Sequence, residues 1–341
     1  MRDKIDVSVV IPTRNRADLL DRVLDSFAQQ STPPTAFEVV VVDDGSTDGT
    51  ADACRRTRDG LHVQYVWIAR AGSAAAKNAG IAASRGRLVL LADDDDVADP
   101  DLVKEHLRVH EENPAVEVVA LGYGAWHTAL RVTELMHFVT EVGQFLSSYP
   151  QLRHGELLDF RYFWSGRVSA KRELLVQCGG FDEGMVALED VELGYRLSSL
   201  GLRVLFTRRA VSYMLRSFDF DAFCARCERT GRGLAHFRQL YPGAISDQYA
   251  RALLGKHAHE LDAADRAAAL TVTERRLAAL RPVVLDLEQR LDDHGRRRLL
   301  PVRLSPARRR LHRLYAMSFR AAMLKGALRA NAGSETRPAR P

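Results

Sequence analysis

The sequence predicts an α/β protein: an open, mostly parallel sheet with helices on both faces, followed by a mainly α-helical C-terminal extension. Three observations carry this prediction. Short strand-like runs alternate with helix-like segments over the first hundred residues. These runs are mostly apolar, which is typical of parallel strands covered on both faces. After about Phe218 strand signals nearly disappear, and Ala-, Leu- and Arg-rich stretches continue to about Ala330.

Strands are expected where β-branched and aliphatic residues run together, at 7–11, 37–42, 61–68 and 88–92. Between them the spacing of apolar residues predicts helices over 17–29, 50–57 and 72–83. Parallel strands joined by right-handed helical crossovers form a doubly wound sheet. Ligands of such a sheet bind beyond the carboxyl ends of its strands, so functional residues are expected there.

The rest of the chain mixes apolar segments with Gly-rich turns before it becomes helical. A helix is expected over 191–200 and a strand over 203–207. We expect a domain over 1–217 and a helical extension over 218–330. The extension includes a basic segment at 296–329, and a disordered tail is expected over 331–341.

The charge of the chain is unevenly distributed. The net charge is +5, but residues 296–341 hold 13 Lys or Arg and one acid, Glu335, so they carry +12 and the remainder carries −7. This asymmetry leaves three alternatives for the basic segment: contact with an anionic membrane surface, packing on the acidic body, or a solvated helix. Nucleic acid is not an expected partner, because no recognised reading module or interleaved aromatic residues are present.

The composition also bears on the compartment. No run approaches the roughly 18–20 apolar residues of a membrane-spanning helix, and the first residues contain no apolar core of signal-peptide length. Four cysteines are too few for a disulfide scaffold, and Cys224 and Cys227 are expected as buried helix residues rather than zinc ligands. We therefore expect a cytoplasmic protein, peripheral at the inner face of the membrane if the basic segment binds lipid.

Four consecutive aspartates, Asp93 to Asp96, follow the strand at 88–92. Adjacent carboxylates raise each other's pKa unless a cation is present, and oxygen-rich clusters suit Mg²⁺ or Mn²⁺. Asp93 and Asp95 project to one side if the chain stays extended, so they are the expected metal ligands. A bound cation, rather than the protein's own arginines, is expected to balance the cluster. The alternative is a solvated acidic loop or helix cap.

Two further aspartates, Asp43 and Asp44, end the second strand and precede Gly-Ser-Thr-Asp-Gly. Asp, Gly and Ser are common turn formers, so a simple turn would explain this segment. A carboxylate at this edge of the sheet could also accept a hydrogen bond from a nucleobase or a ribose hydroxyl. The residues alone leave both interpretations open.

Six motifs in this order resemble the family 2 glycosyltransferases of the GT-A fold, over about residues 5–215. They are Val7 to Arg16, Val41 to Thr50, Gly72 to Gly80, Leu91 to Asp96, Gly179 to Asp182, and Glu189–Asp190. The resemblance implies a Rossmann-like sheet, a nucleotide-diphospho-sugar donor and inversion of the anomeric centre. It implies a hydroxyl acceptor, whether glycan, lipid-linked or small molecule, in cell-surface polysaccharide or glycoconjugate synthesis.

The resemblance also assigns residues to the donor and the metal. The donor-binding positions that it implies are Pro12, Thr13, Arg14, Asp43, Asp44, Gly72, Lys77, Asn78, Asp93 and Asp94. Asp93 and Asp95 match the acidic motif that holds a divalent metal, Mg²⁺ or Mn²⁺. Such a cation would neutralise the charge that grows on the departing nucleoside diphosphate. From the residues alone, Lys77 could equally be an exposed helix residue.

Asp190 matches the general base, which would take a proton from the acceptor hydroxyl as that oxygen attacks the anomeric carbon. Glu189 and Trp164 match positions near the acceptor and the donor sugar. Purely structural alternatives are also open. Glu189 and Asp190 could be an N-terminal acidic cap of the following helix, and Trp164 could be a buried core residue.

One departure from the family pattern concerns the metal. The family often carries a His soon after the strand that follows the Glu–Asp pair, and residues 212–215 contain none. This keeps a second interpretation open, a non-catalytic nucleotide-sugar-binding or scaffold protein on a degenerate GT-A fold. A sugar nucleotidyltransferase is less favoured, because the segment after the first strand lacks a Gly-rich phosphate loop.

Overall fold

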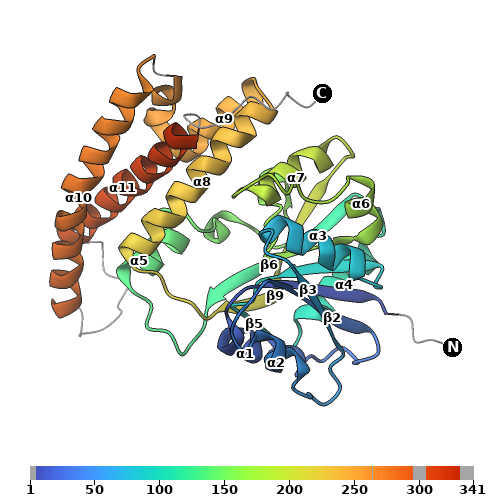
Figure 1. Cartoon of the computed structure of the whole chain (residues 1–341). Helices are drawn as coiled ribbons and strands as arrows, with labels where there is room; N and C mark the ends of the chain where they lie inside the picture. Colours follow the sequence, from blue (N-terminus) through green and yellow to red (C-terminus); the bar gives the residue numbers. More distant parts are fainter. Residues whose placement is uncertain (1–4, 263, 295–304, 331–341) are drawn as a thin grey trace. The chain divides into compact units, whose positions relative to one another are not determined.

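The computed structural model describes residues 5–262, 264–294 and 305–330, and the chain divides into two compact units (Figure 1). Unit 1 comprises Met1–Arg131, Gln151–Gly184 and Glu189–Ser217, and unit 2 comprises Val132–Pro150, Met185–Leu188 and Phe218–Pro341. The tail expected over 331–341 and residues 296–304 of the expected basic segment lie outside the described residues.

Unit 1 contains a nine-stranded mixed sheet in the order β3-β2-β1-β4-β8-β6-β9-β5, with β7 paired to β9. Its strands are β1 (Val7–Thr13), β2 (Phe37–Asp44), β3 (Val63–Ile68), β4 (Leu88–Ala92), β5 (Asp96–Ala98), β6 (Val118–Trp126), β7 (Leu157–Leu158), β8 (Arg167–Lys171) and β9 (Arg203–Met214). The first four strands are parallel and β6 is parallel to β9, whereas β5, β7 and β8 pair antiparallel. The predicted fold class is confirmed.

Helices cover both faces of this sheet. They are α1 (Ala17–Phe27), α2 (Thr50–Arg55), α3 (Ser73–Ala83), α4 (Leu102–Glu112), α6 (Arg172–Gln177), the short 3₁₀ turn η3 (Phe160–Tyr162) and α7 (Glu189–Ser198). Successive residues of a strand face opposite sides. Val9 and Ile11 pack into one core with α1, whereas Val10 faces α3, where a Cβ on Gly80 would lie 2.3 Å from Val10 Cγ1. Only glycine therefore lets α3 approach the sheet this closely.

The chain re-enters the sheet sooner after β4 than the sequence suggested. Asp96 begins β5, whose register pairs Asp96 with Met214, and β9 extends to Met214 rather than ending near residue 207. The solvated acidic loop considered for the four aspartates is therefore wrong, since Asp94 and Asp96 are buried. The β5–β9 pairing places the end of β9 beside the aspartates.

Unit 2 is helical. It contains α5 (Glu134–His137), the π-helical turn η1 (Phe138–Val142), the start of the 3₁₀ turn η2 (Tyr149–Gln151), α8 (Phe220–Leu240), α9 (Ala244–Leu254), the 3₁₀ segment η4 (Gly255–Asp262), α10 (Arg266–His294) and α11 (Pro306–Ala330). Helices α8 and α11 cross very closely, because added Cβ atoms on Gly231 and Gly326 would lie 1.8 and 1.9 Å from backbone oxygens of the other helix. The aromatic cluster of this unit joins η1 to α8 and α11 and consists of Phe138, Phe145, Phe220, Phe223, Tyr315 and Phe319.

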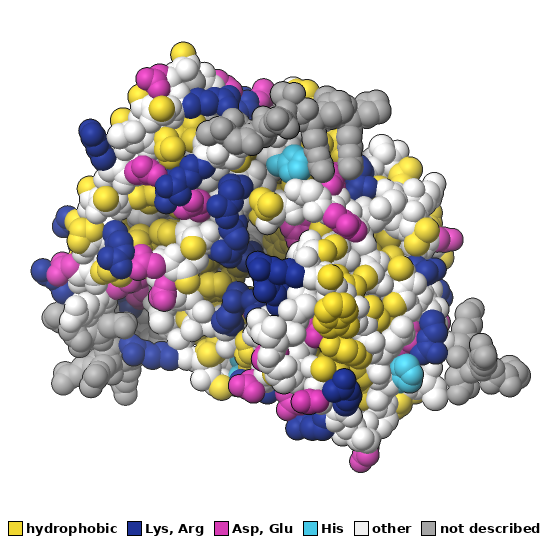
Figure 2. All heavy atoms as spheres, viewed as in Figure 1, with side chains coloured by type: hydrophobic (Ala, Val, Ile, Leu, Met, Phe, Trp, Pro, Cys, Tyr) yellow, Lys and Arg dark blue, Asp and Glu magenta, His cyan; other side chains and the backbone are white. Residues whose placement is uncertain are grey.

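The described part of the basic segment lies in α11, and most of the apolar side chains of this helix are buried, with Met317 exposed. Lys325 and Arg329, which interrupt the apolar side, pair with Glu228 at 2.8 and 2.9 Å. The packing alternative is therefore confirmed for 306–330, whereas a membrane contact through basic side chains stays a prediction. On the face seen in Figure 2, Lys and Arg side chains are interspersed with Asp and Glu. None of the described helices combines the length and apolar character needed to cross a membrane.

Both cysteines lie on a helix as predicted, and the predicted burial is complete for Cys227 only. Cys227 is buried and Cys224 is half-buried, and both are free thiols. Burial raises the pKa of Cys224 to about 12, so this thiol is protonated and inert at neutral pH.

Candidate active site

The predicted strand-end residues meet at one edge of the sheet. The parallel register of β1 and β2 pairs Thr13 with Asp43. The Thr13 hydroxyl donates a hydrogen bond of 2.8 Å to Asp94 Oδ2, just beyond β4. Three segments that are far apart in the sequence therefore converge, as expected for the carboxyl ends of parallel strands.

Arginines balance three of the four aspartates, which corrects the expectation that only a bound cation would do so. Arg16 Nη1 lies 2.5 Å from Asp94 Oδ1 and 3.2 Å from Asp95 Oδ2. Arg216 Nε lies 3.2 Å from the same Asp95 oxygen. Asp96 pairs with Arg167 and accepts a hydrogen bond from Ser212 at 3.2 Å.

Burial works against these ion pairs. It raises the pKa of Asp94 to about 6, with Arg16 opposing the shift, and the pKa of Asp96 to about 7, with Arg167 opposing. The pKa of Asp95 is raised first by burial and then by the neighbouring Asp93 charge. The cluster therefore needs its positive partners to stay ionised at neutral pH.

Asp93 and Asp95 still fit a divalent cation. Among the described residues, the Asp93 carboxylate has no side-chain hydrogen bond or ion pair. Asp95 directs Oδ2 to both arginines, so its Oδ1 keeps its acceptor capacity. Within the described chain no three His, Cys, Asp or Glu side chains gather to hold a metal. A metal at Asp93 and Asp95 would consequently take further oxygens from water or substrate, as Mg²⁺ commonly does.

Gly166 lies directly against Asp93. A Cβ at this position would be 2.2 Å from Asp93 Oδ2, so a side chain there would displace the carboxylate. This contact gives the Trp164-Ser-Gly166 segment a concrete role that its sequence alone did not indicate. It leaves room for Asp93 to bind an ion.

Asp43 and Asp44 hold the surrounding loops. Asp43 accepts hydrogen bonds from the Ser46 amide at 2.8 Å and the Tyr65 hydroxyl at 2.7 Å. Asp44 accepts from the amides of Ala71 and Gly72, at 2.6 and 3.1 Å, just before α3. The turn interpretation describes Asp43, and contact of either residue with a nucleobase stays a prediction.

Arg14 and Asn15 continue the segment after β1. Arg14 has a buried Nε with no hydrogen-bond partner among the described residues. Asn15 adopts φ +51° and accepts a hydrogen bond of 2.8 Å from the Thr47 amide. This left-handed residue turns the chain after Pro12 and Thr13 so that Arg16 reaches the aspartates. The predicted donor contacts of Pro12, Thr13 and Arg14 are compatible with this edge and stay predictions.

Lys77 is buried in α3 and is not the exposed helix residue that the sequence allowed. Its Nζ donates to Ser165 Oγ at 2.6 Å and to Glu189 Oε1 at 2.9 Å, and it lies 5.2 Å from the centre of the Phe181 ring. The Glu189 and Asp190 charges keep the pKa of Lys77 above its usual value despite burial. Lys77 is therefore a cation that holds the Glu189–Asp190 segment.

Asn78, the next residue, holds a different segment, around Phe181. It exchanges two hydrogen bonds with the backbone of Phe181, at 2.8 and 2.9 Å, and donates to Glu183 at 3.0 Å. The predicted roles of Lys77 and Asn78 toward the donor stay predictions, but their present contacts are with the protein.

Asp190 lies in the first turn of α7, next to Glu189, as the acidic-cap alternative describes. This position is compatible with a catalytic role, which stays a prediction. Its Oδ1 accepts from the Val191 amide at 2.8 Å, and the Ser165 amide is 3.5 Å from Oδ2. Burial, followed by the Glu189 charge, raises the pKa of Asp190 to about 6, while Lys77 opposes this. Such a carboxylate is ionised near neutral pH and basic enough to accept a proton.

Trp164 is half-buried, so it is not the buried core residue that the structural alternative described. Its neighbour Phe163 is fully buried in the core. The indole Nε1 donates to the Arg161 carbonyl at 2.9 Å, and its ring lies 5.3 Å from that of Tyr162. Trp164 thus offers a partly exposed aromatic surface one residue before Ser165. Contact with a sugar stays a prediction.

Sequence reasoning missed Arg16, Arg167 and Arg216 as partners of the aspartates. Arg16 ends the first of the six motifs, Val7 to Arg16, so the sequence already indicates that it lies near the end of β1. Arg167 and Arg216 are far away in the chain, and only the antiparallel β4–β8 and β5–β9 pairings bring them to this edge. Spacing along the sequence holds no signal for those pairings.

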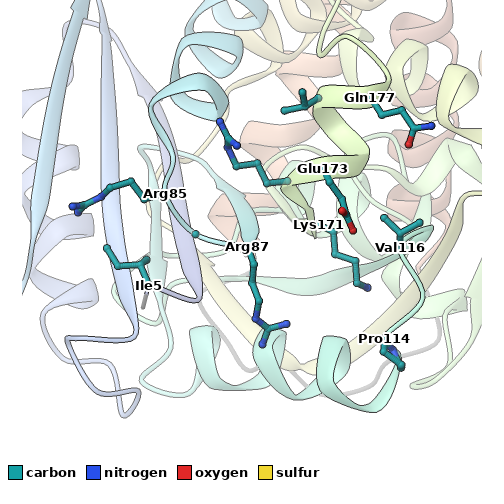
Figure 3. A pocket seen from close by; sticks show the side chains of 11 residues that line it. Ile5, Arg85, Arg87, Pro114, Val116, Lys171, Glu173 and Gln177 are labelled. Carbon is teal, nitrogen blue, oxygen red and sulfur yellow. The ribbon is translucent and has the colours of Figure 1, made fainter. Parts of the chain in front are cut away.

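A large hollow of about 1600 Å³ lies at the opposite, amino-terminal edge of the sheet (Figure 3). Its basic side chains already have internal partners. Arg85 pairs with Glu38, Arg87 with Asp6, and Lys171 donates to the Ala115 carbonyl at 2.6 Å. The hollow is therefore distinct from the aspartate edge and offers little unbalanced charge to a ligand.

Comparison with known proteins agrees with this geometry. Residues 8–174 match the family described as Glycosyl transferase family 2. A validoxylamine A glucosyltransferase from Streptomyces hygroscopicus subsp. limoneus is 35% identical over 229 residues, covering 60% of this chain and 50% of that relative. The chain thus spans about half the length of the relative.

Two solved structures share the fold. The mannosyltransferase PcManGT from Pyrobaculum calidifontis, in complex with GDP-Man and Mn²⁺, has a TM-score of 0.61 at 22% identity, covering 94% of this chain and 86% of that chain. S. aureus TarS 1-349, in complex with UDP-GlcNAc, has a TM-score of 0.51 at 19% identity, covering 73% and 80%. These likenesses confirm the fold, and the match of residues 8–174 to glycosyl transferase family 2 confirms the resemblance seen in the motifs.

Proposed function

We propose that this chain is an inverting glycosyltransferase that moves a sugar from a nucleotide-diphospho-sugar to an acceptor hydroxyl with the help of a divalent metal. One observation carries the proposal. Two consecutive residues connect the acidic groups: the Ser165 amide faces Asp190, and Gly166 lies against Asp93. A basic carboxylate and a metal-binding carboxylate thus flank one short segment. We assign the chemistry to the domain expected over 1–217.

Asp190 and the aspartate cluster, on either side of this segment, would have different roles in a single displacement. Asp190 would take the proton of the acceptor hydroxyl while that oxygen attacks the anomeric carbon. The diphosphate would leave on the opposite side, toward the aspartates and Arg16. When bound at Asp93 and Asp95, Mg²⁺ or Mn²⁺ would supply the charge that stabilises this leaving group.

The donor class is supported by the solved neighbours. PcManGT was solved in complex with GDP-Man and Mn²⁺, and TarS 1-349 in complex with UDP-GlcNAc. Both ligands are nucleotide-diphospho-sugars, so we propose this class for the present chain. The acceptor is proposed only as a hydroxyl compound, because the partly exposed Trp164 suits a sugar ring but selects no particular one.

The test replaces the base without changing its shape. Asp190→Asn should lower transfer by about 10²–10⁴-fold and leave donor binding intact, measured with a panel of nucleotide sugars and Mn²⁺. Asp52→Asn, at an exposed position on α2, is the matched control and should retain full activity. Wild-type turnover in Asp190→Asn would refute the assignment of the base.

The scaffold alternative has one observation in its favour, since Arg16, Arg167 and Arg216 already balance most of the aspartates. It predicts that nucleotide sugars bind but are never cleaved. Donor hydrolysis by the wild-type protein in the absence of acceptor separates the two functions. Slow hydrolysis of any donor with Mn²⁺ supports the transferase, and binding without hydrolysis supports the scaffold.

A further inference from the structure

We propose that Gly233 of α8 is a positioning residue for the base, because it seats the carbonyl group of Ala187, two residues before Glu189–Asp190. The inference rests on the proposed function, in which Asp190 is the base, and extends it to a residue of the helical C-terminal extension. Its basis is a close approach of two backbones. A Cβ atom on Gly233 would lie 2.2 Å from the Ala187 carbonyl oxygen and 2.7 Å from the carbonyl carbon.

The contact lies within unit 2. This unit comprises the short segment Met185–Leu188 as well as α8, and unit 1 resumes at Glu189. Met185 is buried and anchors the start of the segment, so the contact with Gly233 holds its end. The chain thus passes from a backbone that α8 holds to the proposed base within three residues.

Helix propensity does not explain Gly233. A glycine inside a helix is less stable than an alanine, because it loses more backbone entropy on folding, and α8 is 21 residues long. The neighbouring glycine of this helix, Gly231, makes room for the backbone of α11. The three nearest atoms to a Cβ on Gly233, by contrast, all belong to Ala187. The absence of a side chain at position 233 therefore serves the segment 185–188.

Leu188 shows that this segment has an uncommon conformation. Its φ is +61°, a sign that it shares, among the described non-glycine residues, with Asn15 and Gln144. A bulky side chain rarely adopts this left-handed region, and such a residue persists where its surroundings over-determine it. The Ala187 carbonyl and the Leu188 amide belong to one planar peptide unit. Seating the carbonyl against Gly233 therefore fixes the plane from which Leu188 turns.

The turn at Leu188 determines how the chain enters α7. Further along, α7 is closely packed, since a Cβ on Gly194 would lie 2.5 Å from the Phe160 carbonyl oxygen. The Ser165 amide, by contrast, is 3.5 Å from Asp190 Oδ2, longer than the usual distance for such a bond. The position of the Asp190 carboxylate thus depends on the entry of the chain as well. A displacement of about 1 Å near reacting groups can lower a rate about 10²-fold.

The test adds one methyl group to the full chain. In Gly233→Ala either the Ala187 carbonyl or α8 must shift, because real Cβ atoms essentially never lie within 3.0 Å of such an atom. Gly231→Ala is the matched control, since it places the same group on the same helix, 1.8 Å from the Met323 carbonyl oxygen of α11. Turnover of a panel of nucleotide sugars with Mn²⁺, calorimetric binding of UDP and GDP, hydrogen exchange and thermal unfolding are measured for each variant.

The two variants are expected to differ in catalysis rather than in stability alone. Gly233→Ala should lower kcat by about 10- to 100-fold without weakening the binding of UDP or GDP, and it should speed hydrogen exchange over residues 187–191. Gly231→Ala should lower the unfolding temperature but keep kcat and the exchange of residues 187–191 close to wild type. Equal losses of kcat in the two variants would overturn the proposal, as would unchanged kcat and exchange in Gly233→Ala.

Further variants test the route through Leu188 to the base. Leu188→Asn suits a positive φ and should retain kcat, whereas the β-branched side chain of Leu188→Val should lower it; equal effects would contradict the role of the turn. In an Asp190→Asn background, Gly233→Ala should cause little further loss, because residues that act through one group are not additive. A full additional loss would overturn the positioning role. If the proposed function failed instead, wild-type protein would turn over no nucleotide sugar, and hydrogen exchange would still decide whether Gly233 fixes this segment.

Discussion

The two acidic centres of unit 1 differ in how positive side chains balance their carboxylates. The four aspartates at the end of β4 face three arginines, and Asp94, Asp95 and Asp96 each contact at least one of them. At the Glu189–Asp190 pair the nearby cation is Lys77, which contacts Glu189 rather than Asp190. The first centre pairs its buried carboxylates directly with guanidinium groups, although burial still raises the pKa of Asp94 to about 6 and that of Asp96 to about 7. The second leaves Asp190 ionised yet basic, which is what proton transfer requires.

The largest effect is expected at Asp93, the aspartate of the first centre whose side chain has no partner within the described part of the chain. Asp93→Asn should lower sugar transfer by about 10²-fold or more and weaken Mn²⁺ binding, because it removes a proposed ligand of the leaving-group cation. Asp96→Asn is the matched control within the cluster, since Asp96 is occupied by Arg167 and Ser212. Equal losses of Mn²⁺ affinity in the two variants would contradict the distinction between them.

At the second centre, Lys77 lowers the pKa of Asp190. Because the pKa of Asp190 is raised to about 6, this carboxylate would lose the base function proposed for it as the pH falls through 6. The positive charge of Lys77 lowers that pKa, so Lys77→Met should move the acidic limb of the pH–rate profile to higher pH, by about one unit. The profile of kcat/KM between pH 5 and 9 measures this. A lower rate with an unshifted limb would indicate that Lys77 acts only as a structural residue.

The smallest expected effect concerns stability at the first centre. Arg16→Met leaves the buried Asp94 without its cation and should cost about 2 kcal/mol of unfolding free energy, a value reduced for the partial exposure of Arg16. Urea unfolding at neutral pH measures it, with Arg55→Met on the exposed Arg55–Asp52 pair as control. A loss no larger than that of the control would show that Asp94 is stabilised mainly by Thr13.

The parallel half of the sheet was predictable because its strands are mostly apolar runs and the strand ends carry their own motifs. Thr13, Asp43 and Asp94 converge as expected for that reason. The antiparallel half of the sheet was not predictable, because β5 is only three residues long and pairs with β9 more than a hundred residues later. The arginine partners of the aspartates depend on that long-range pairing. The burial of Lys77 likewise depends on Ser165 and Glu189, which no local pattern links to α3.

The close crossing of α8 and α11 has a consequence for handling this protein. Gly231 and Gly326 bring the two backbones together, and Tyr315 and Phe319 fill the aromatic cluster beneath them. The helix α11, which makes up most of the basic segment, thus forms part of the core of unit 2. Shortening the chain before α11 would uncover Phe138 and Phe223, so an expression clone trimmed there should yield aggregated material rather than a smaller working enzyme.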